Sequence, residues 1–168
     1  MKKYFIGIIS FLGLLSSCSD GDITIQRIEF TGTEAYSCTA DISTNFLYKI
    51  QDRQALILTF TSGMLKNEEG TVTGSIPTNF KLYYRIFDVA PTRTYFCSMP
   101  PPSSPRVTSE IEAQGGSVEI TTQAVEDTQN NTTRYTHIIR IKDLLITNAD
   151  GERLIESNFN FGTYQTTE

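Results

Sequence analysis

Three cysteines carry the clearest chemistry in this chain of 168 residues. Cys18 ends a Leu-Ser-Ser-Cys stretch that closes an apolar run over residues 4–15, and this run follows a basic start with Lys2 and Lys3. A positive start, an apolar centre too short for a stable membrane span and a small-residue end are typical of a secretory signal. We therefore expect residues 1–17 to be a cleaved signal peptide.

The cleavage site ends in cysteine rather than Ala-x-Ala, and it resembles the lipobox of bacterial lipoproteins. The resemblance implies that the Cys18 thiol accepts a lipid, becomes the first mature residue and attaches the protein to the outer membrane. Residues 18–22, Cys-Ser-Asp-Gly-Asp, form a short acidic tether. It is similar to the signals that follow the lipidated cysteine in surface-displayed lipoproteins of Bacteroidota. We expect the domain to face the cell surface, and a periplasm-facing position is the alternative.

Cys38 and Cys97 are the two cysteines that remain once Cys18 is lipidated. Export to an oxidising compartment favours a disulfide between them. Such a bridge would close a long loop and stabilise the fold by roughly 3–5 kcal/mol in the chain-entropy model. The alternative is a pair of buried free thiols that pack as small apolar groups.

Catalysis has little support in the sequence. The single histidine, His137, lies in strand-like sequence in line with Tyr135, Ile139 and Ile141, so we expect a hydrogen-bonded core or rim residue. The chain has no Gly-x-Ser-x-Gly motif and no Cys–His spacing typical of nucleophilic catalysis or of a zinc site. Its acidic clusters do not follow a calcium-loop pattern. We predict a non-enzymatic protein without a metal or cofactor.

A candidate binding surface lies on one predicted strand. The residues of its polar face carry a tyrosine, a phenylalanine and two basic groups: Lys81, Tyr83, Arg85 and Phe87. The residues of its other face are apolar: Phe80, Leu82, Tyr84 and Ile86. Exposed aromatic rings flanked by polar groups can stack on sugars, so the first set is a candidate glycan surface. The alternative is that Tyr83 and Phe87 pack under a loop or a second sheet.

The remaining pattern is one of short strands, with no helical stripe longer than about a turn. We expect strand-like pairs at 23–25 and 28–30 with a bulge near residues 26 and 27, and strands over 46–50, 55–61, 71–76, 80–87, 92–97, 107–113, 118–122 and 135–146. A last strand should run through Leu154, Phe159 and Phe161. Residues 92–97 should pair with 80–87, and Gly115 and Gly116 should supply a turn after which the chain returns. The proline-rich segment 99–105 should be a rigid connector between two sheets. This spacing predicts an all-β fold over residues 23–168, a single antiparallel, immunoglobulin-like β-sandwich.

Charge limits the partners of this domain. Removal of residues 1–17 takes away Lys2 and Lys3 and no acidic residue, so the net charge changes from −5 to −7. An acidic domain without a basic cluster argues against nucleic acid and against electrostatic attraction to anionic lipid. Membrane attachment then depends on the lipid on Cys18.

Several stretches together resemble a family of small, mostly uncharacterised lipoproteins of Bacteroidota. They are the mature start at 18–22, Leu-Tyr-Tyr-Arg-Ile-Phe at 82–87, the Cys- and Pro-containing segment 95–105, and Gly-Gly-Ser-Val-Glu-Ile-Thr-Thr at 115–122. The resemblance implies an exported, lipid-anchored β-domain and supplies no catalytic residue. We expect an accessory or scaffolding subunit that docks on an outer-membrane protein. The alternative is a surface glycan-binding module beside a nutrient importer.

Overall fold

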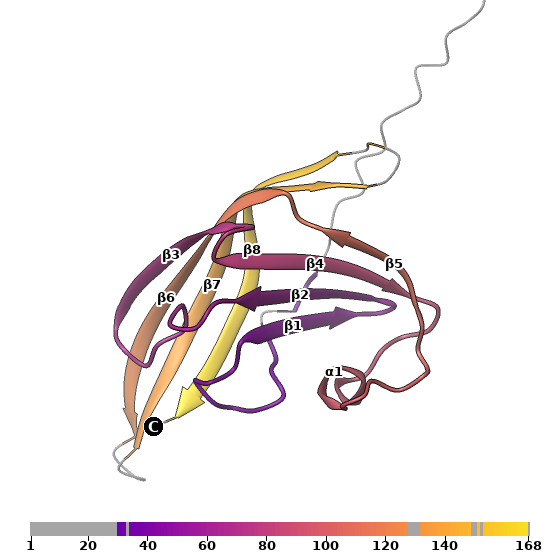
Figure 1. Ribbon diagram of the computed structural model, residues 1–168. Helices are drawn as coiled ribbons and strands as arrows, with labels where there is room; N and C mark the ends of the chain where they lie inside the picture. The colour runs from indigo at the N-terminus through magenta and orange to yellow at the C-terminus, as the bar shows by residue number, and fades with distance from the viewer. Residues whose placement is uncertain (1–29, 33, 128–131, 149–150, 152, 168) are drawn as a thin grey trace, which may run out of the picture.

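The computed structural model describes residues 30–32, 34–127, 132–148, 151 and 153–167. They form two four-stranded antiparallel sheets that pack face to face (Figure 1). One sheet has the order β1-β2-β4-β5, with bounds Phe46–Gln51, Gln54–Phe60, Phe80–Phe87 and Val107–Glu112. The other has the order β3-β6-β7-β8, with bounds Gly70–Ile76, Gly115–Asp127, Thr132–Thr147 and Arg153–Thr167. The prediction of an all-β, single antiparallel β-sandwich is confirmed.

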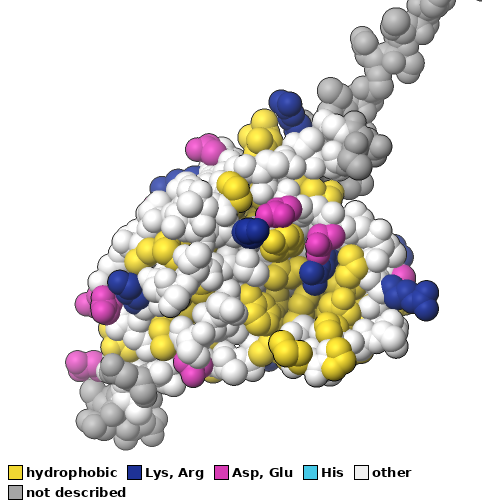
Figure 2. All heavy atoms as spheres, in the orientation of Figure 1, with side chains coloured by type: hydrophobic (Ala, Val, Ile, Leu, Met, Phe, Trp, Pro, Cys, Tyr) yellow, Lys and Arg dark blue, Asp and Glu magenta, His cyan; other side chains and the backbone are white. Residues whose placement is uncertain are grey.

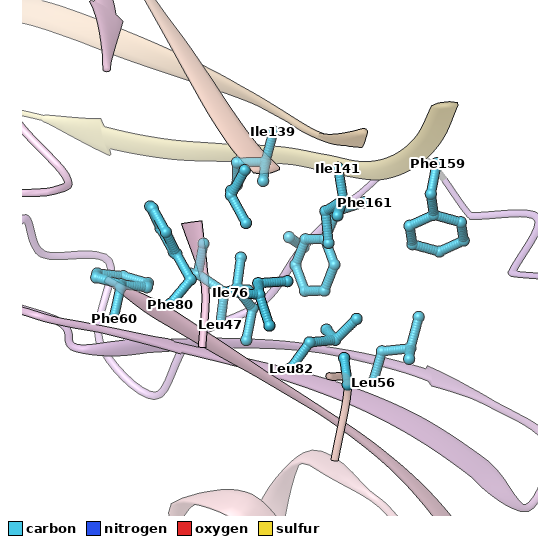
Figure 3. Close-up of a cluster of buried hydrophobic side chains, with 14 of the residues drawn as sticks. Leu47, Leu56, Phe60, Ile76, Phe80, Leu82, Ile139, Ile141, Phe159 and Phe161 are labelled. Carbon is cyan, nitrogen blue, oxygen red and sulfur yellow. The ribbon is translucent and has the colours of Figure 1, made fainter. Parts of the chain in front are cut away.

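The main core lies between the two sheets. Alternate residues of β2, Leu56, Leu58 and Phe60, point into it because successive side chains of a strand face opposite sides. Ile139 and Ile141 of β7 meet them from the other sheet, and Figure 3 shows several of these side chains converging. This burial is the dominant apolar contribution to the stability of the sandwich.

The first sheet also has an apolar outer face. Tyr48, Ala55, Ile57 and Phe87 form a second buried cluster there, separate from the main core. β1 and β2 pair so that Tyr48 lies opposite Ile57, which brings the two side chains to the same face. A sheet that is apolar on both faces needs a cover on each side.

A short helix supplies part of this second cover. Helix α1, Arg93–Cys97, stands where the sequence predicted a strand over 92–97, so that prediction is wrong. In a strand, Tyr95 and Phe96 would face opposite sides, whereas one helical turn lets both neighbouring rings pack against the outer cluster. The connector prediction for 99–105 is also corrected, because the segment leads from α1 to β5 in the sheet that holds β4.

The predicted disulfide fixes α1 against the rest of the domain. Cys38 and Cys97 are bonded, with their Cα atoms 5.3 Å apart, inside the usual range for a disulfide. The bridge joins α1 to the segment that precedes β1. That segment closes one side of the sandwich, because Tyr36 exchanges backbone hydrogen bonds with Tyr48 of β1 while the Ala35 amide donates to the Thr163 carbonyl of β8.

The prediction that the chain returns at Gly115 and Gly116 is wrong. β5 pairs with β4, and β6 pairs with β3 and β7, so the chain crosses from one sheet to the other without reversing. At the crossing, the Ala113 amide donates to the Leu82 carbonyl and the Gln114 amide to the Leu145 carbonyl. Gly116 has a φ of 139°, which only glycine adopts readily, and this explains its place at the bend.

The predicted signal peptide 1–17, the tether 18–22 and the bulge expected near residues 26 and 27 lie outside the described residues. Within the described part of the chain, no helix is long and apolar enough to cross a membrane. The predicted long strand over 135–146 is confirmed as β7.

Loss of the disulfide should destabilise the domain strongly. In a chain whose Cys18 is replaced by Ser, the further change Cys38→Ala/Cys97→Ala should lower the free energy of unfolding by about 4 kcal/mol, since the bridge links residues 59 apart. Urea unfolding under non-reducing conditions measures this. Thiol titration of the denatured, unreduced Cys18→Ser protein should find no free thiol, and two free thiols would contradict the bridge.

Candidate functional site

The predicted surface on β4 divides into exposed and buried parts. Lys81 is exposed, Tyr83 and Arg85 are half-buried, and all three lie on the outer face of the first sheet. β5 supplies the acidic partners of the two basic groups. In the pairing of β4 with β5, Arg85 lies opposite Glu110, and Tyr83, two residues before Arg85, lies opposite Glu112. The structure therefore brings Lys81, Tyr83 and Arg85 together on one surface.

Phe87 does not belong to that surface. Its side chain is only 1% exposed, because α1 covers it. The rings of Tyr95 and Phe96 meet it edge to face, with centroids 5.1 and 6.2 Å away. The alternative considered from the sequence, packing under a connecting segment, holds for Phe87. Its place in the candidate binding surface is corrected accordingly.

The outer surface of the first sheet, which we call the aromatic face, extends beyond the predicted strand. Tyr48 stacks on Phe96 with ring centroids 4.4 Å apart, and Phe46 stacks on Tyr48 at 6.1 Å. The partly buried members of this face, in contact with the buried outer cluster, are Tyr36, Phe46, Ile50, Tyr83, Tyr95 and Phe96. Figure 2 shows hydrophobic side chains gathered over β1, β2 and β4, with pairs of basic and acidic side chains at the border.

Two ion pairs form that border. Lys81 Nζ lies 3.8 Å from Glu112 Oε1, and Arg85 Nε contacts Glu110 Oε2. Both are cross-strand pairs between β4 and β5, and exposed pairs of this kind contribute at most about 1 kcal/mol to stability. Their main effect is to compensate charge beside the apolar surface, which leaves Tyr83 between two neutralised pairs.

The segment that joins β4 to β5 adds exposed apolar groups at one end of the aromatic face. Met99 is 99% exposed, and Val89 and Val107 are also exposed. Asp88 closes the base of this segment, since its amide donates to the Arg106 carbonyl and its carboxylate accepts from the Arg106 amide at 2.8 Å. The exposed groups are thus held on a closed loop rather than on a free end.

His137 is buried and hydrogen-bonded, as the sequence predicted. It is 0% exposed, with Nε2 3.0 Å from Thr166 Oγ1 and Nδ1 2.9 Å from Thr122 Oγ1. The Thr166 hydroxyl donates to Asn67 Oδ1 at 2.6 Å, so it accepts from Nε2–H, and Nδ1 then accepts from Thr122. Burial lowers the pKa of His137 to about 4, and the imidazole is neutral at pH 7. Its ring cannot reach a substrate from this position.

A pair of clefts flanks Tyr36 where the segment before β1 closes the sandwich. One, of about 260 Å³, holds Arg93, whose guanidinium lies 5.1 Å from the centroid of the Tyr36 ring. The other, of about 290 Å³, reaches Lys49. The Tyr36 hydroxyl donates to Glu34 at 3.0 Å, and this bond raises the pKa of Tyr36 above its ordinary value. Sequence reasoning missed these clefts, because no motif marks them.

No group of three histidine, cysteine, aspartate or glutamate side chains in the described residues is placed to hold a metal ion. Comparisons with models of protein families, with curated proteins and with solved structures find no significant match.

The His137 site should make stability depend on pH. The pKa of His137 in the folded protein, about 4, lies below the ordinary 6.5. The stability that neutral, buried His137 contributes is therefore fully present above pH 6.5 and is lost as the pH falls from 6.5 toward 4. Over this window the loss approaches about 3 kcal/mol. Urea unfolding at pH 7 and pH 4.5 measures it, and His137→Gln removes this term while keeping the carboxylate titrations. An equal pH dependence in the two proteins would contradict the assignment.

Proposed function

We propose that this protein is a lipid-anchored accessory subunit of an envelope complex, held by a lipid on Cys18 at the outer membrane and facing the cell surface. It acts without catalysis, by docking the aromatic face against another outer-membrane protein. The observation that carries this proposal is the aromatic face itself. A rigid sheet holds it, and α1 covers only part of it.

The anatomy of the aromatic face supports a protein partner. Stable interfaces have an apolar centre rich in tyrosine and phenylalanine and a polar rim that excludes water. Here Tyr83 and Phe46 are among the partly buried aromatic side chains of the face, and the pairs Lys81–Glu112 and Arg85–Glu110 provide a rim with no net charge. A compensated rim can be covered by a partner without leaving an unpaired charge, which is the costly outcome at an interface.

The short chain distance between Cys18 and the sandwich supports docking within the membrane plane. Eleven residues, 19–29, lie between Cys18 and Phe30, and even a fully extended chain of this length spans at most roughly 35–40 Å. A domain this close to its lipid anchor stays near the bilayer and can turn the aromatic face toward a neighbouring membrane protein. Its local concentration around that neighbour is high.

A glycan ligand is the second candidate for the same surface. The observation that favours it is the position of Tyr83, whose half-buried ring lies between two charged pairs. Sugars stack on aromatic rings and exchange hydrogen bonds with guanidinium and carboxylate groups at the border. A glycan-binding module beside a nutrient importer would use this surface in place of a protein contact.

Lipid attachment is testable separately from docking. Cys18→Ser should abolish incorporation of labelled palmitate in the native host and move the protein from the membrane to the soluble fraction, since the acyl chains supply about 0.8 kcal/mol of membrane affinity per buried CH₂. Val125→Ser is the matched control, because it introduces a serine at an exposed position of β6, leaves Cys18 and the disulfide intact and should keep the label. Retention of the label in Cys18→Ser would disprove lipidation at this residue.

Docking through the aromatic face predicts a partner that depends on Tyr83. Crosslinking followed by affinity purification from detergent-solubilised outer membranes should recover one dominant membrane protein. Tyr83→Ala should reduce its recovery by about tenfold or more, the size expected for a central interface tyrosine. Val125→Ala is the control, because Val125 is 57% exposed on β6 of the other sheet. Near-UV circular dichroism checks that both variants keep the fold.

Each outcome of this experiment is informative. Recovery of the wild-type protein alone would contradict an accessory role, and undiminished recovery in Tyr83→Ala would contradict the proposed surface. Saturable binding to a polysaccharide that Tyr83→Ala abolishes and Val125→Ala retains would favour the glycan alternative. The same variants therefore distinguish the two functions.

A further inference from the structure

Lys49 is the one buried side chain among the lysines, arginines, aspartates and glutamates that the structure describes. It is 3% exposed and follows Leu47 by two positions on the edge strand β1, so the two side chains share a face. Leu47 belongs to the core between the sheets, and Lys49 therefore faces the inside of the sandwich. Its Nζ donates a hydrogen bond to the carbonyl oxygen of Gly32. Among the described residues, no carboxylate lies within ion-pair distance of Nζ. A buried ammonium normally requires such a partner.

A cleft of about 290 Å³ leads to Lys49. Its lining combines the apolar side chains of Phe30 and Ile50 with Tyr36 and Glu34. The Glu34 carboxylate already accepts the hydrogen bond from the Tyr36 hydroxyl at 3.0 Å. The cleft is large enough for a molecule of about ten non-hydrogen atoms or fewer. Phe30, Ile50 and the Tyr36 ring offer it apolar surface, and the Glu34 carboxylate in the same lining disfavours an anion.

We propose that Lys49 is a nucleophilic amine, and that this cleft admits a small uncharged aldehyde with which Lys49 forms an imine. A buried amine that has no ion-pair partner, as Lys49 has none among the described residues, is the environment in which proteins use lysine for Schiff-base chemistry. This activity differs from docking through the aromatic face, because the Lys49 side chain faces the inside of the sandwich, although Tyr36 and Ile50 belong both to the cleft and to that face.

The chemical step needs no other reactant. The lone pair of the neutral Lys49 nitrogen attacks the carbonyl carbon, and a proton passes from nitrogen to the former carbonyl oxygen to give a carbinolamine. Loss of that oxygen as water leaves the C=N bond of the imine. One water is released for each imine formed, and nothing is oxidised or reduced.

The state of the nitrogen agrees with this geometry. Burial lowers the pKa of Lys49 below its ordinary value, because desolvation disfavours the charged form. The titratable groups of the described residues that line the cleft with Lys49 are Glu34 and Tyr36. The hydrogen bond to Glu34, together with partial burial, keeps the Tyr36 hydroxyl protonated. The neutral amine is therefore more abundant at Lys49 than at an exposed lysine of the same chain.

A purely structural role is the competing explanation. Lys49 fixes Gly32, and the Gln51 side chain accepts from the Thr31 amide at 2.8 Å, so the two residues together hold segment 30–32 on β1. A lysine with this role alone would react with an aldehyde more slowly than the exposed lysines do. The rates of reaction thus separate the two explanations.

The experiment uses the full chain in detergent, benzaldehyde as the probe and sodium cyanoborohydride to trap the imine as a benzylamine. Peptide mass spectrometry follows the modified fraction at each lysine from pH 6 to pH 9. At pH 7, Lys49 should be modified faster than the exposed Lys66, Lys81 and Lys142, by about tenfold for each unit by which its pKa is lower.

Lys49→Arg should lose this fast-reacting site while its guanidinium keeps a donor for Gly32, and Lys142→Arg is the control that should leave it unchanged. The wild-type measurement stands even if Lys49→Arg fails to fold, because all lysines are compared within one protein. Modification of Lys49 no faster than the exposed lysines at pH 7 would overturn the proposal.

Discussion

The burial of apolar side chains on both faces of the sheet β1-β2-β4-β5 is the constraint on which the rest of the structure depends. On β2, Leu56 and Leu58 pack between the sheets while Ala55 and Ile57 face outward. The second sheet packs against the inner face and buries most of its apolar side chains. The outer face receives only a local cover, which α1 and the bonded cysteines provide. The incomplete cover leaves the aromatic face available to a partner.

The parts of the fold that could be predicted from sequence are those set by local alternation. The apolar run of β2 marks a central strand, and the alternation over 80–87 correctly assigns Leu82 and Tyr83 to opposite faces. The pairing of Cys38 with Cys97 followed from setting aside Cys18 as the expected lipidated residue and counting the cysteines that remain. His137 was placed by its alignment with apolar neighbours of β7. In each case a period of two or a simple count was sufficient.

The parts that could not be predicted depend on contacts between distant segments. Tyr95 and Phe96 are consistent with a strand or a helical turn, and only the outer cluster decides between them. Gly116 permits a hairpin or a crossing, and the pairing of Ala113 with Leu82 and of Gln114 with Leu145 selects the crossing. The burial of Phe87 could not be predicted for the same reason, because the side chains that bury it come from α1 and not from its own strand.

His137 and Lys49, the two buried side chains with a basic nitrogen in the described residues, lie in different environments within the same sandwich. His137 lies on β7 between hydroxyls that can each donate or accept, so the neutral ring is fully satisfied and has no path to solvent. Lys49 lies on an edge strand, and its burial depends on a segment laid across it rather than on its own strand. An edge position leaves room for a cleft, whereas a central position does not. Lys49 therefore combines desolvation with access, and this combination is what nucleophilic chemistry requires of an amine.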